Sequence, residues 1–274
     1  MLRDLKELDD YTISASDGNI GAVKDFLFDD LSWAVRYFVV ETGSWLSSHK
    51  VLISPIAIQK ADWKNKILPV LITKDQVKNS PNLDADKPVS RQHEMDYLNF
   101  YGYPYYWEGN QLWGGDMYPY LLNPDYNDAL TELRDPKNNH FFDESKRENL
   151  QKSDPDLRSA KEIVGYHIHA IDGDIGHVSG LLVEEDTWAV RYLVIDTSNW
   201  WGGHQVLISP EWIKKVQWFD RSVLVDVNRQ LIKDAPEYSS VETLNREHEM
   251  AIYEHYGLTG YWARKPKSNV EKSN

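Results

Sequence analysis

Apolar and polar residues alternate with a period of two over much of the chain, which is typical of half-buried β-strands. Residues 11–28 predict a hairpin, because a DG pair separates two alternating runs and favours a tight turn. The run 33–42 is apolar on both of its faces, so we expect it to be a central strand. Two more apolar runs follow at 49–54 and 67–72, and Pro55 ends the first because proline has no amide hydrogen. We expect these short strands to close into a small barrel, since closure removes unpaired edges.

The alternation gives way to helical spacing near two occurrences of the sequence RxHEM. Ser90 is placed to cap a helix over 91–101 that stops at Gly102, and Asn245 is placed to cap a second helix over 246–256. Helices of about eleven residues are unstable alone, so we expect both to dock on the strands.

An internal repeat explains why these features occur twice. Residues 11–107 align with 166–262 at a constant offset of 155 without a gap, and 37 of the 97 positions are identical. The sequence WAVRYFVVETGSW, which begins at Trp33, returns as WAVRYLVIDTSNW, which begins at Trp188. Each copy is therefore expected to be one folding unit.

The repeat predicts a mainly β fold. We expect two small closed antiparallel β-barrels, each followed by short helices and related by pseudo-twofold symmetry, as in a homodimer within one chain. The expected segments are a first barrel with its helical extension (1–107), an acidic linker containing aromatic residues (108–165), a second barrel with its extension (166–262) and a flexible tail (263–274).

The repeated motifs resemble those of the PRC-barrel family. The likeness rests on DGxIGxV, the following WAVRY strand and the sequence HxVLISP, and it covers residues 11–78 and 166–233. It implies a compact, highly bent barrel of about six strands, and the HEM extension resembles bacterial members with two barrels. Known relatives include the cytoplasmic part of the photosynthetic reaction-centre H subunit and a ribosome-maturation factor of 16S rRNA processing. In these relatives the barrel is a protein-docking surface without chemistry of its own.

Composition limits the function. The formal net charge of −13 disfavours DNA and RNA as partners, because nucleic-acid binding relies on basic surfaces. The chain has no cysteine, which excludes disulfides and thiolate metal sites. No apolar run reaches 18 residues and no apolar leader opens the sequence, so we expect a cytoplasmic protein without a transmembrane segment.

Four residues at equivalent positions are candidates for contact with a partner: Trp45, His49, Trp200 and His204. Each histidine begins a strand just after a loop that carries the tryptophan, and exposed aromatic residues often anchor interfaces. The alternative, which we favour, is that each tryptophan covers the open end of its own barrel.

Arg36 and Arg191 lie within apolar strands. The nearby carboxylates are expected to be those of Asp17, Glu41, Asp172 and Asp196. A catalytic or anion-binding arginine is one interpretation. A structural ion pair is favoured, because a buried guanidinium needs partners.

No metal or cofactor site is predicted. HEM lacks the second histidine of HExxH, since Tyr97 and Ile252 stand at the required positions. His167, His169 and His177 have no counterpart in the first copy; they are open to a pH-sensing role or to ordinary surface positions.

The sequence therefore favours a non-enzymatic tandem protein that docks an unknown protein partner, and it leaves homo-oligomerisation open. The alternatives are a small-ligand or enzymatic role at a groove between the barrels, and a ribosome or RNA-associated role by analogy with the maturation factor.

Overall fold

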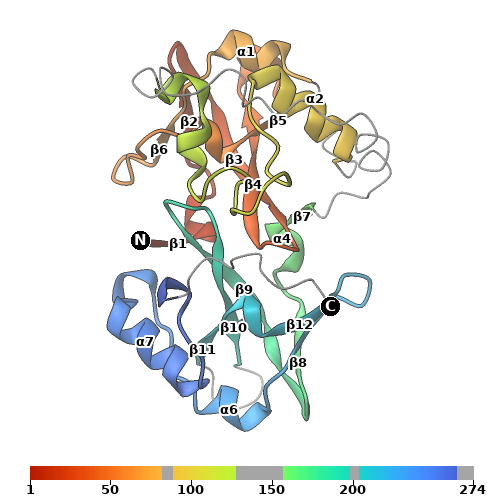
Figure 1. Cartoon of the computed structure of the whole chain (residues 1–274), viewed down its shortest axis with the longest axis vertical. Helices are drawn as coiled ribbons and strands as arrows, with labels where there is room; N and C mark the ends of the chain where they lie inside the picture. Colours follow the sequence, from red (N-terminus) through yellow and green to blue (C-terminus); the bar gives the residue numbers. More distant parts are fainter. Residues whose placement is uncertain (82–88, 128–156, 198–203, 264–274) are drawn as a thin grey trace, which may run out of the picture. The chain divides into compact units, whose positions relative to one another are not determined.

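The computed structural model describes residues 1–81, 89–127, 157–197 and 204–263. The chain forms two compact units (Figure 1): the first contains Met1–Val164 and Gly180–Arg191, and the second contains Gly165–Ser179 and Tyr192–Asn274. The units do not coincide with the two copies of the repeat, because residues 180–191 of the second copy belong to the first unit.

The first unit contains one sheet, and its strands β2 to β6 lie where the alternating runs of the first copy predict strands. Its strands are β2 (Thr12–Ala15), β3 (Gly18–Asp29), β4 (Ala34–Thr42), β5 (Lys50–Ile53), β6 (Ile67–Pro69) and β7 (Leu157–Ser159). They are arranged in the order β5-β4-β3-β2-β6, and β7 pairs with β3. The prediction of a central strand is confirmed, because β4 lies between β3 and β5 and is buried on both faces.

The second copy has the same order of five strands and adds β12 at one edge. Its strands are β8 (His167–Ala170), β9 (Gly173–Glu184), β10 (Val190–Asp196), β11 (Gln205–Ile208), β12 (Ile213–Gln217) and β13 (Ser222–Val225). Their order is β11-β10-β9-β8-β13-β12. The end of β9 belongs to the first unit, where β1 (Leu2–Asp4) pairs antiparallel with it.

The prediction of closed antiparallel barrels is wrong. Over the described residues both sheets are open, and both are mixed, because β2 pairs in parallel with β6 and β8 in parallel with β13. The chain leaves β5 at Pro55, which cannot donate to a further ladder, and turns through a 3-10 segment before β6. The amide of Ser54, just after β5, donates to the hydroxyl of Tyr97 at 3.0 Å. A side chain from the helix over 91–101 therefore provides the hydrogen-bond partner for this amide, and a further strand does not.

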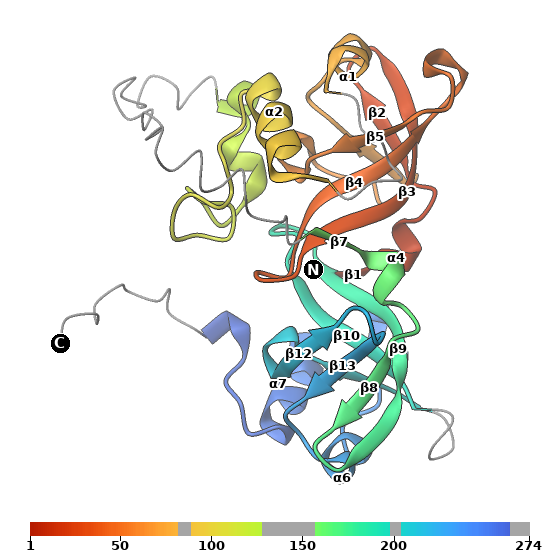
Figure 2. The ribbon, with the colours of Figure 1, turned by 90° about the vertical axis from the view of Figure 1, so that its right-hand side faces the viewer.

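The helices begin where the capping residues predict. The α-helices are α1 (Lys74–Asn79), α2 (Arg91–Tyr101), α4 (Ala160–Ile163), α6 (Arg229–Lys233) and α7 (Arg246–His255). The 3-10 segments are η1 (Leu5–Leu8), η2 (Ser44–Leu46), η3 (Pro55–Ala57), η4 (Pro119–Leu122), η5 (Pro124–Asn127), η8 (Pro210–Trp212), η9 (Val241–Thr243) and η10 (Tyr261–Ala263). Ser90 and Asn245 cap α2 and α7 by accepting the amides of His93 and His248. Figure 2 shows α2 alongside β4 and β5.

Gly21 and its equivalent Gly176 allow two strands to approach closely. A Cβ atom at either position would lie 2.0 Å from a carbonyl oxygen on the neighbouring strand, that of Glu41 or Asp196. No side chain fits there, so both copies need glycine after the DG turn.

Within the segment 108–165, the described residues up to Val164 belong to the first unit. Trp113 is only 1 % exposed, and β7 pairs with β3. None of the helices in the described part of the chain is long and apolar enough to cross a membrane.

Candidate functional site: buried arginine–carboxylate clusters

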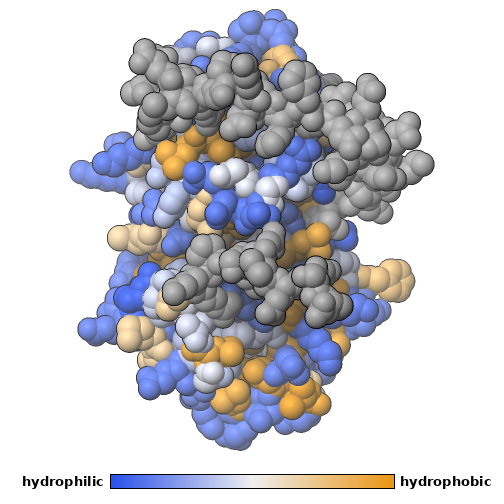
Figure 3. Space-filling model, in the orientation of Figure 1, coloured by the Kyte–Doolittle hydropathy of each residue, from blue (hydrophilic) through white to orange (hydrophobic). Residues whose placement is uncertain are grey.

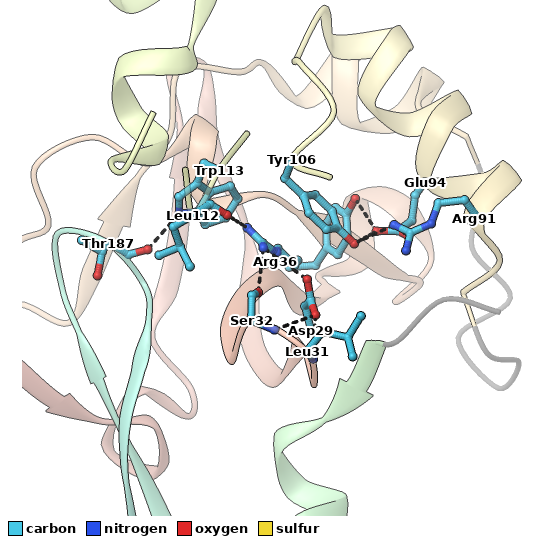
Figure 4. Close-up of polar contacts among 11 residues, drawn as sticks. Asp29, Leu31, Ser32, Arg36, Arg91, Glu94, Tyr106, Leu112, Trp113 and Thr187 are labelled. Atoms are coloured by element: carbon cyan, nitrogen blue, oxygen red, sulfur yellow. Dashed lines mark hydrogen bonds and ion pairs between the residues drawn. The ribbon is translucent and has the colours of Figure 1, made fainter. Parts of the chain in front are cut away.

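The turn between β3 and β4 is organised by the carboxylate of Asp29. One oxygen accepts the amides of Leu31 and Ser32 at 2.9 and 3.1 Å. The other accepts a guanidinium hydrogen of Arg36 at 3.2 Å, and the same guanidinium nitrogen donates to the Ser32 hydroxyl at 2.8 Å. Figure 4 shows these groups converging on Arg36. The turn and the central strand are thereby tied together by a buried ion pair.

Aromatic rings enclose the remaining faces of Arg36. The guanidinium carbon lies 3.9 Å from the ring centre of Tyr106 and 4.7 Å from that of Trp113. Its second terminal nitrogen donates to the carbonyl of Leu112 at 2.8 Å, and the Trp113 indole donates to the carbonyl of Thr187 at 2.8 Å (Figure 4). Arg36 is 2 % exposed, so this charge is engaged in holding the segment after α2 and not presented to solvent.

The second copy repeats the arrangement, with Glu184 in place of Asp29, so that the carboxylate side chain is one methylene longer. The guanidinium of Arg191 lies 2.5 Å from the carboxylate of Glu184, which also accepts the Thr187 hydroxyl at 2.7 Å. Burial acts to raise the pKa of Glu184, but the charge and hydrogen bonds of Arg191 outweigh it and hold this pKa below its ordinary value. The Arg191 side chain is 21 % exposed, so this pair is less enclosed than that of Arg36.

A second cluster joins α2 to the sheet through Glu94. Its carboxylate pairs with Arg91 at 2.8 Å and accepts the hydroxyls of Tyr106 at 2.7 Å and of Tyr37, on β4, at 3.2 Å. Glu94 is completely buried. Burial raises the pKa of Glu94 to about 7, although Arg91 and the two hydroxyls act in the opposite direction.

The same four residue types meet in the second copy. Glu249 accepts the hydroxyls of Tyr192 at 3.0 Å and Tyr261 at 2.9 Å, and it pairs with Arg246 at 3.0 Å. In both copies the arginine and the glutamate of RxHEM therefore form an ion pair one helical turn apart. The glutamate also accepts a hydrogen bond from a tyrosine of the central strand. From the sequence we considered only the histidine of this motif and missed its charged residues. The signal that could have found them is that all four positions are identical in both copies.

Of the four residues predicted to contact a partner, Trp45, His49 and His204 lie within the described part of the chain. The half-buried Trp45 donates its indole hydrogen to the carbonyl of Ile20 at 2.7 Å, and the ammonium of Lys74 lies 4.6 Å from its ring centre. His49 is exposed, and its carbonyl accepts the Thr42 amide. His204 is half-buried and makes the equivalent contact with Thr197. Trp200 lies outside the described residues, and partner contact by these four residues stays a prediction.

The carboxylates that we expected near the two arginines have other partners. Asp17 accepts the first amide of α1, that of Lys74, at 2.9 Å, and Asp172 accepts the first amide of α6, that of Arg229, at 2.8 Å. The aspartate of each DG turn therefore ties its hairpin to a helix N-terminus.

The partners and the burial of Glu94 limit the chemistry of its cluster. The carboxylate oxygens of Glu94 are occupied by two hydroxyls and a guanidinium, and the side chain has no exposed surface. A general acid or base must reach the proton of a substrate. The arrangement instead holds α2 in one position on the sheet.

Comparisons with known proteins cover little of the chain. No family model matches it. A 73-residue stretch is 37 % identical to an uncharacterised protein of Deinococcus radiodurans. This stretch covers 27 % of the present chain and 26 % of that protein, so the match spans about a quarter of each.

Proposed function

We propose that the chain is a non-enzymatic cytoplasmic docking protein, in which α7 of the second copy binds an extended segment of a partner protein that contains aromatic residues and proline. The observation that carries this proposal is a difference in exposure between equivalent residues. Met250 is 54 % exposed whereas Met95 is 4 % exposed, and Leu258 is 42 % exposed whereas Tyr103 is 5 % exposed. Large apolar side chains in a group on a surface are typical of an interaction site.

The exposed residues of the second copy lie next to one another. Trp262, itself 37 % exposed, packs on the Tyr253 ring with 5.2 Å between centroids and lies under the Arg246 guanidinium at 4.3 Å. Arg246, Met250 and Tyr253 follow one face of α7. Met250 lies one turn after Arg246 on this face, and the amide of Leu258, just after α7, donates to the carbonyl of Tyr253 at 2.9 Å. We term Met250, Leu258 and Trp262 the α7 patch. Figure 3 shows apolar side chains interrupting the polar surface.

The first copy indicates what kind of segment fits. There the chain continues after α2 through residues 108–127, which contain one tryptophan, three tyrosines and two prolines. Asn123 donates to the carbonyl of Ile56 at 2.9 Å, and the Pro124 ring comes within 3.8 Å of a Cβ atom built at Gly102, at the end of α2. An equivalent segment from a partner would cover the α7 patch in the same manner.

Two further observations support docking. The buried Glu249 cluster holds α7 on its sheet, and a surface that is already ordered loses less entropy when it binds. The resemblance to the PRC-barrel family, whose barrels serve as docking surfaces, points in the same direction by analogy.

The direct test uses the chain's own segment as the probe. A fluorescein-labelled peptide of residues 108–127 is titrated with the full chain, and fluorescence anisotropy is recorded. We expect saturable binding that weakens about tenfold or more in a Met250→Lys, Leu258→Lys variant, since charges would replace apolar contacts. Phe219→Lys is the matched control, because Phe219 is apolar and 99 % exposed but lies in the β12–β13 turn.

No saturable binding, or equal binding by the variant, would contradict the proposal. Light scattering of the unlabelled chain in the same buffer shows whether a second copy supplies the segment, which would make the docking protein a homo-oligomer.

A further inference from the structure

The hairpin β8–β9 of the second unit carries three histidines on its solvent-facing side. His167 and His169 flank Ile168, which is completely buried, so the two imidazoles share the opposite face of β8. His167 is exposed, and His169 and His177 are half-exposed. Of the nine histidines in the chain, three therefore lie within one small area of one hairpin.

The strand register brings two of these imidazoles face to face. His167 pairs with His177 across the hairpin. The amide of His167 donates at 3.0 Å to Arg221, towards β13, so its backbone does not bond to β9. Such non-hydrogen-bonded pairs bring side chains closest, with Cβ atoms about 4.5–5.5 Å apart. Two imidazoles at this separation can bind one ion.

Carboxylates accompany the imidazoles. Asp174 pairs with His169 in the register, and its carboxylate contacts Nδ1 of that ring. This contact is the one that commonly orients a metal-binding histidine and leaves Nε2 free for the ion. On the next strand, Ala22 faces Glu41 in the first copy, and the repeat offset places Asp196 opposite His177 in the same way. Both carboxylates favour a cation at this face.

We propose that this face of β8–β9 binds one divalent transition-metal ion of the Zn²⁺ or Ni²⁺ type, with His167 and His177 as the paired ligands and His169 as the third. Imidazole nitrogens suit these ions and not Mg²⁺ or Ca²⁺, which prefer oxygen ligands. Among the described residues the three side chains do not already converge as a ligand group. The ring of His167 is exposed and those of His169 and His177 are half-exposed, so the rings can change rotamer and the ion itself assembles the set.

The first copy supplies the reference for this site. At the equivalent positions it carries Thr12, Ser14 and Ala22, in the same β2–β3 register. The same backbone therefore forms without imidazoles, and the copy-one residues are substitutions that the hairpin accommodates. This site is separate from the α7 patch, so the two proposals stand or fall independently.

The test is calorimetric titration of the full chain, without a polyhistidine tag, with ZnCl₂ near pH 7.5. We expect one ion per chain with a Kd of about 10 μM or tighter, weakened about tenfold or more in His167→Thr and in His177→Ala. The matched control is His49→Ala, an exposed histidine of the first copy, which leaves the affinity unchanged. Millimolar Mg²⁺ does not compete.

A further readout identifies the groups that hold the ion: zinc-edge X-ray absorption is expected to show at least two imidazole ligands. Far-UV circular dichroism verifies that each variant is folded. Absence of saturable binding by the unaltered chain overturns the proposal, as does a loss below tenfold in either folded variant.

Discussion

Trp33 and Trp188 occupy equivalent positions in the two copies, and within the first unit the carbonyl of each accepts a backbone hydrogen bond from the other copy. Trp188 accepts the amide of Val35 at 2.9 Å, and Trp33 accepts the amide of Val190 at 2.7 Å. Both tryptophans have a left-handed φ, 54° and 57°, which is uncommon for a bulky residue. The strained turns are therefore held in place by their reciprocal bonds and by the packing of their rings.

The packing of these two rings predicts unequal effects of substitution. Trp188 is 3 % exposed and meets the ring of Phe38 edge to face at 4.8 Å, whereas Trp33 is half-exposed and stacks on Phe28. Trp188→Ala is expected to lower the free energy of unfolding by about 3 kcal/mol or more, and Trp33→Ala by less. Both variants keep a Cβ atom at positive φ, so backbone strain does not cause the difference. Urea denaturation followed by circular dichroism measures it, and a larger loss for Trp33→Ala would contradict the prediction.

Glu94 predicts a pH dependence of stability. Its pKa in the folded protein, about 7, lies above the ordinary value of 4.5, so the folded state binds this proton more tightly than the unfolded state. The resulting stabilisation is complete below about pH 4.5 and is lost as the pH rises through 7. The advantage of the unaltered chain over Glu94→Gln, which cannot titrate, should therefore shrink by about 3 kcal/mol from pH 4.5 to 7.5.

The measurement for Glu94 is a set of urea denaturation curves at several pH values for both proteins. Subtracting the two curves removes the contributions of all other carboxylates, provided that they titrate alike in both proteins. If the advantage grew with pH, the proton would be bound more tightly by the unfolded chain and the prediction would be wrong.

The two strand arginines predict a contrast between a buried and a half-exposed ion pair. Arg36→Met removes the charge beside Asp29 inside the ring enclosure and should cost about 3 kcal/mol. Arg191→Met, at a pair that is 21 % exposed on each side, should cost about 1 kcal/mol or less. Thermal and urea unfolding of the two variants test this order, and equal losses would mean that the enclosure by Tyr106 and Trp113 adds nothing.

Substitution of Trp45 is expected to cause a modest loss of stability that measures the contribution of one hydrogen bond. Trp45→Phe keeps an aromatic ring but removes the indole donor to Ile20, and it is expected to cost about 1 kcal/mol. His49→Ala, at an exposed side chain on the same hairpin, should change stability by less than about 0.5 kcal/mol. A loss from His49→Ala that matched that of Trp45→Phe would show that the histidine also supports the hairpin.

Local patterns were sufficient to predict several elements. The DG turn, the central strand and the caps at Ser90 and Asn245 all depend on residues within a few positions of each other. Alternation, capping and backbone freedom act over that range, so a single sequence reveals them. The duplicated sequence corresponds to a shared order of five strands in the two copies, to which the second copy adds β12 at one edge.

Tertiary structure decided the features that join distant residues. Tyr37 and Glu94 are 57 residues apart, and only the docking of α2 on β4 brings them together. The first sheet is open because its edge strands, β5 and β6, do not pair with each other, and the alternation of either strand does not reveal this. The choice of Asp29 over Asp17 as the partner of Arg36 likewise depends on which carboxylate the turn buries. Sequence spacing specifies which residues share a face of a strand or helix and which residues cap a helix. Which faces then pack together depends on desolvation and on loop closure, and both act on the whole folded chain.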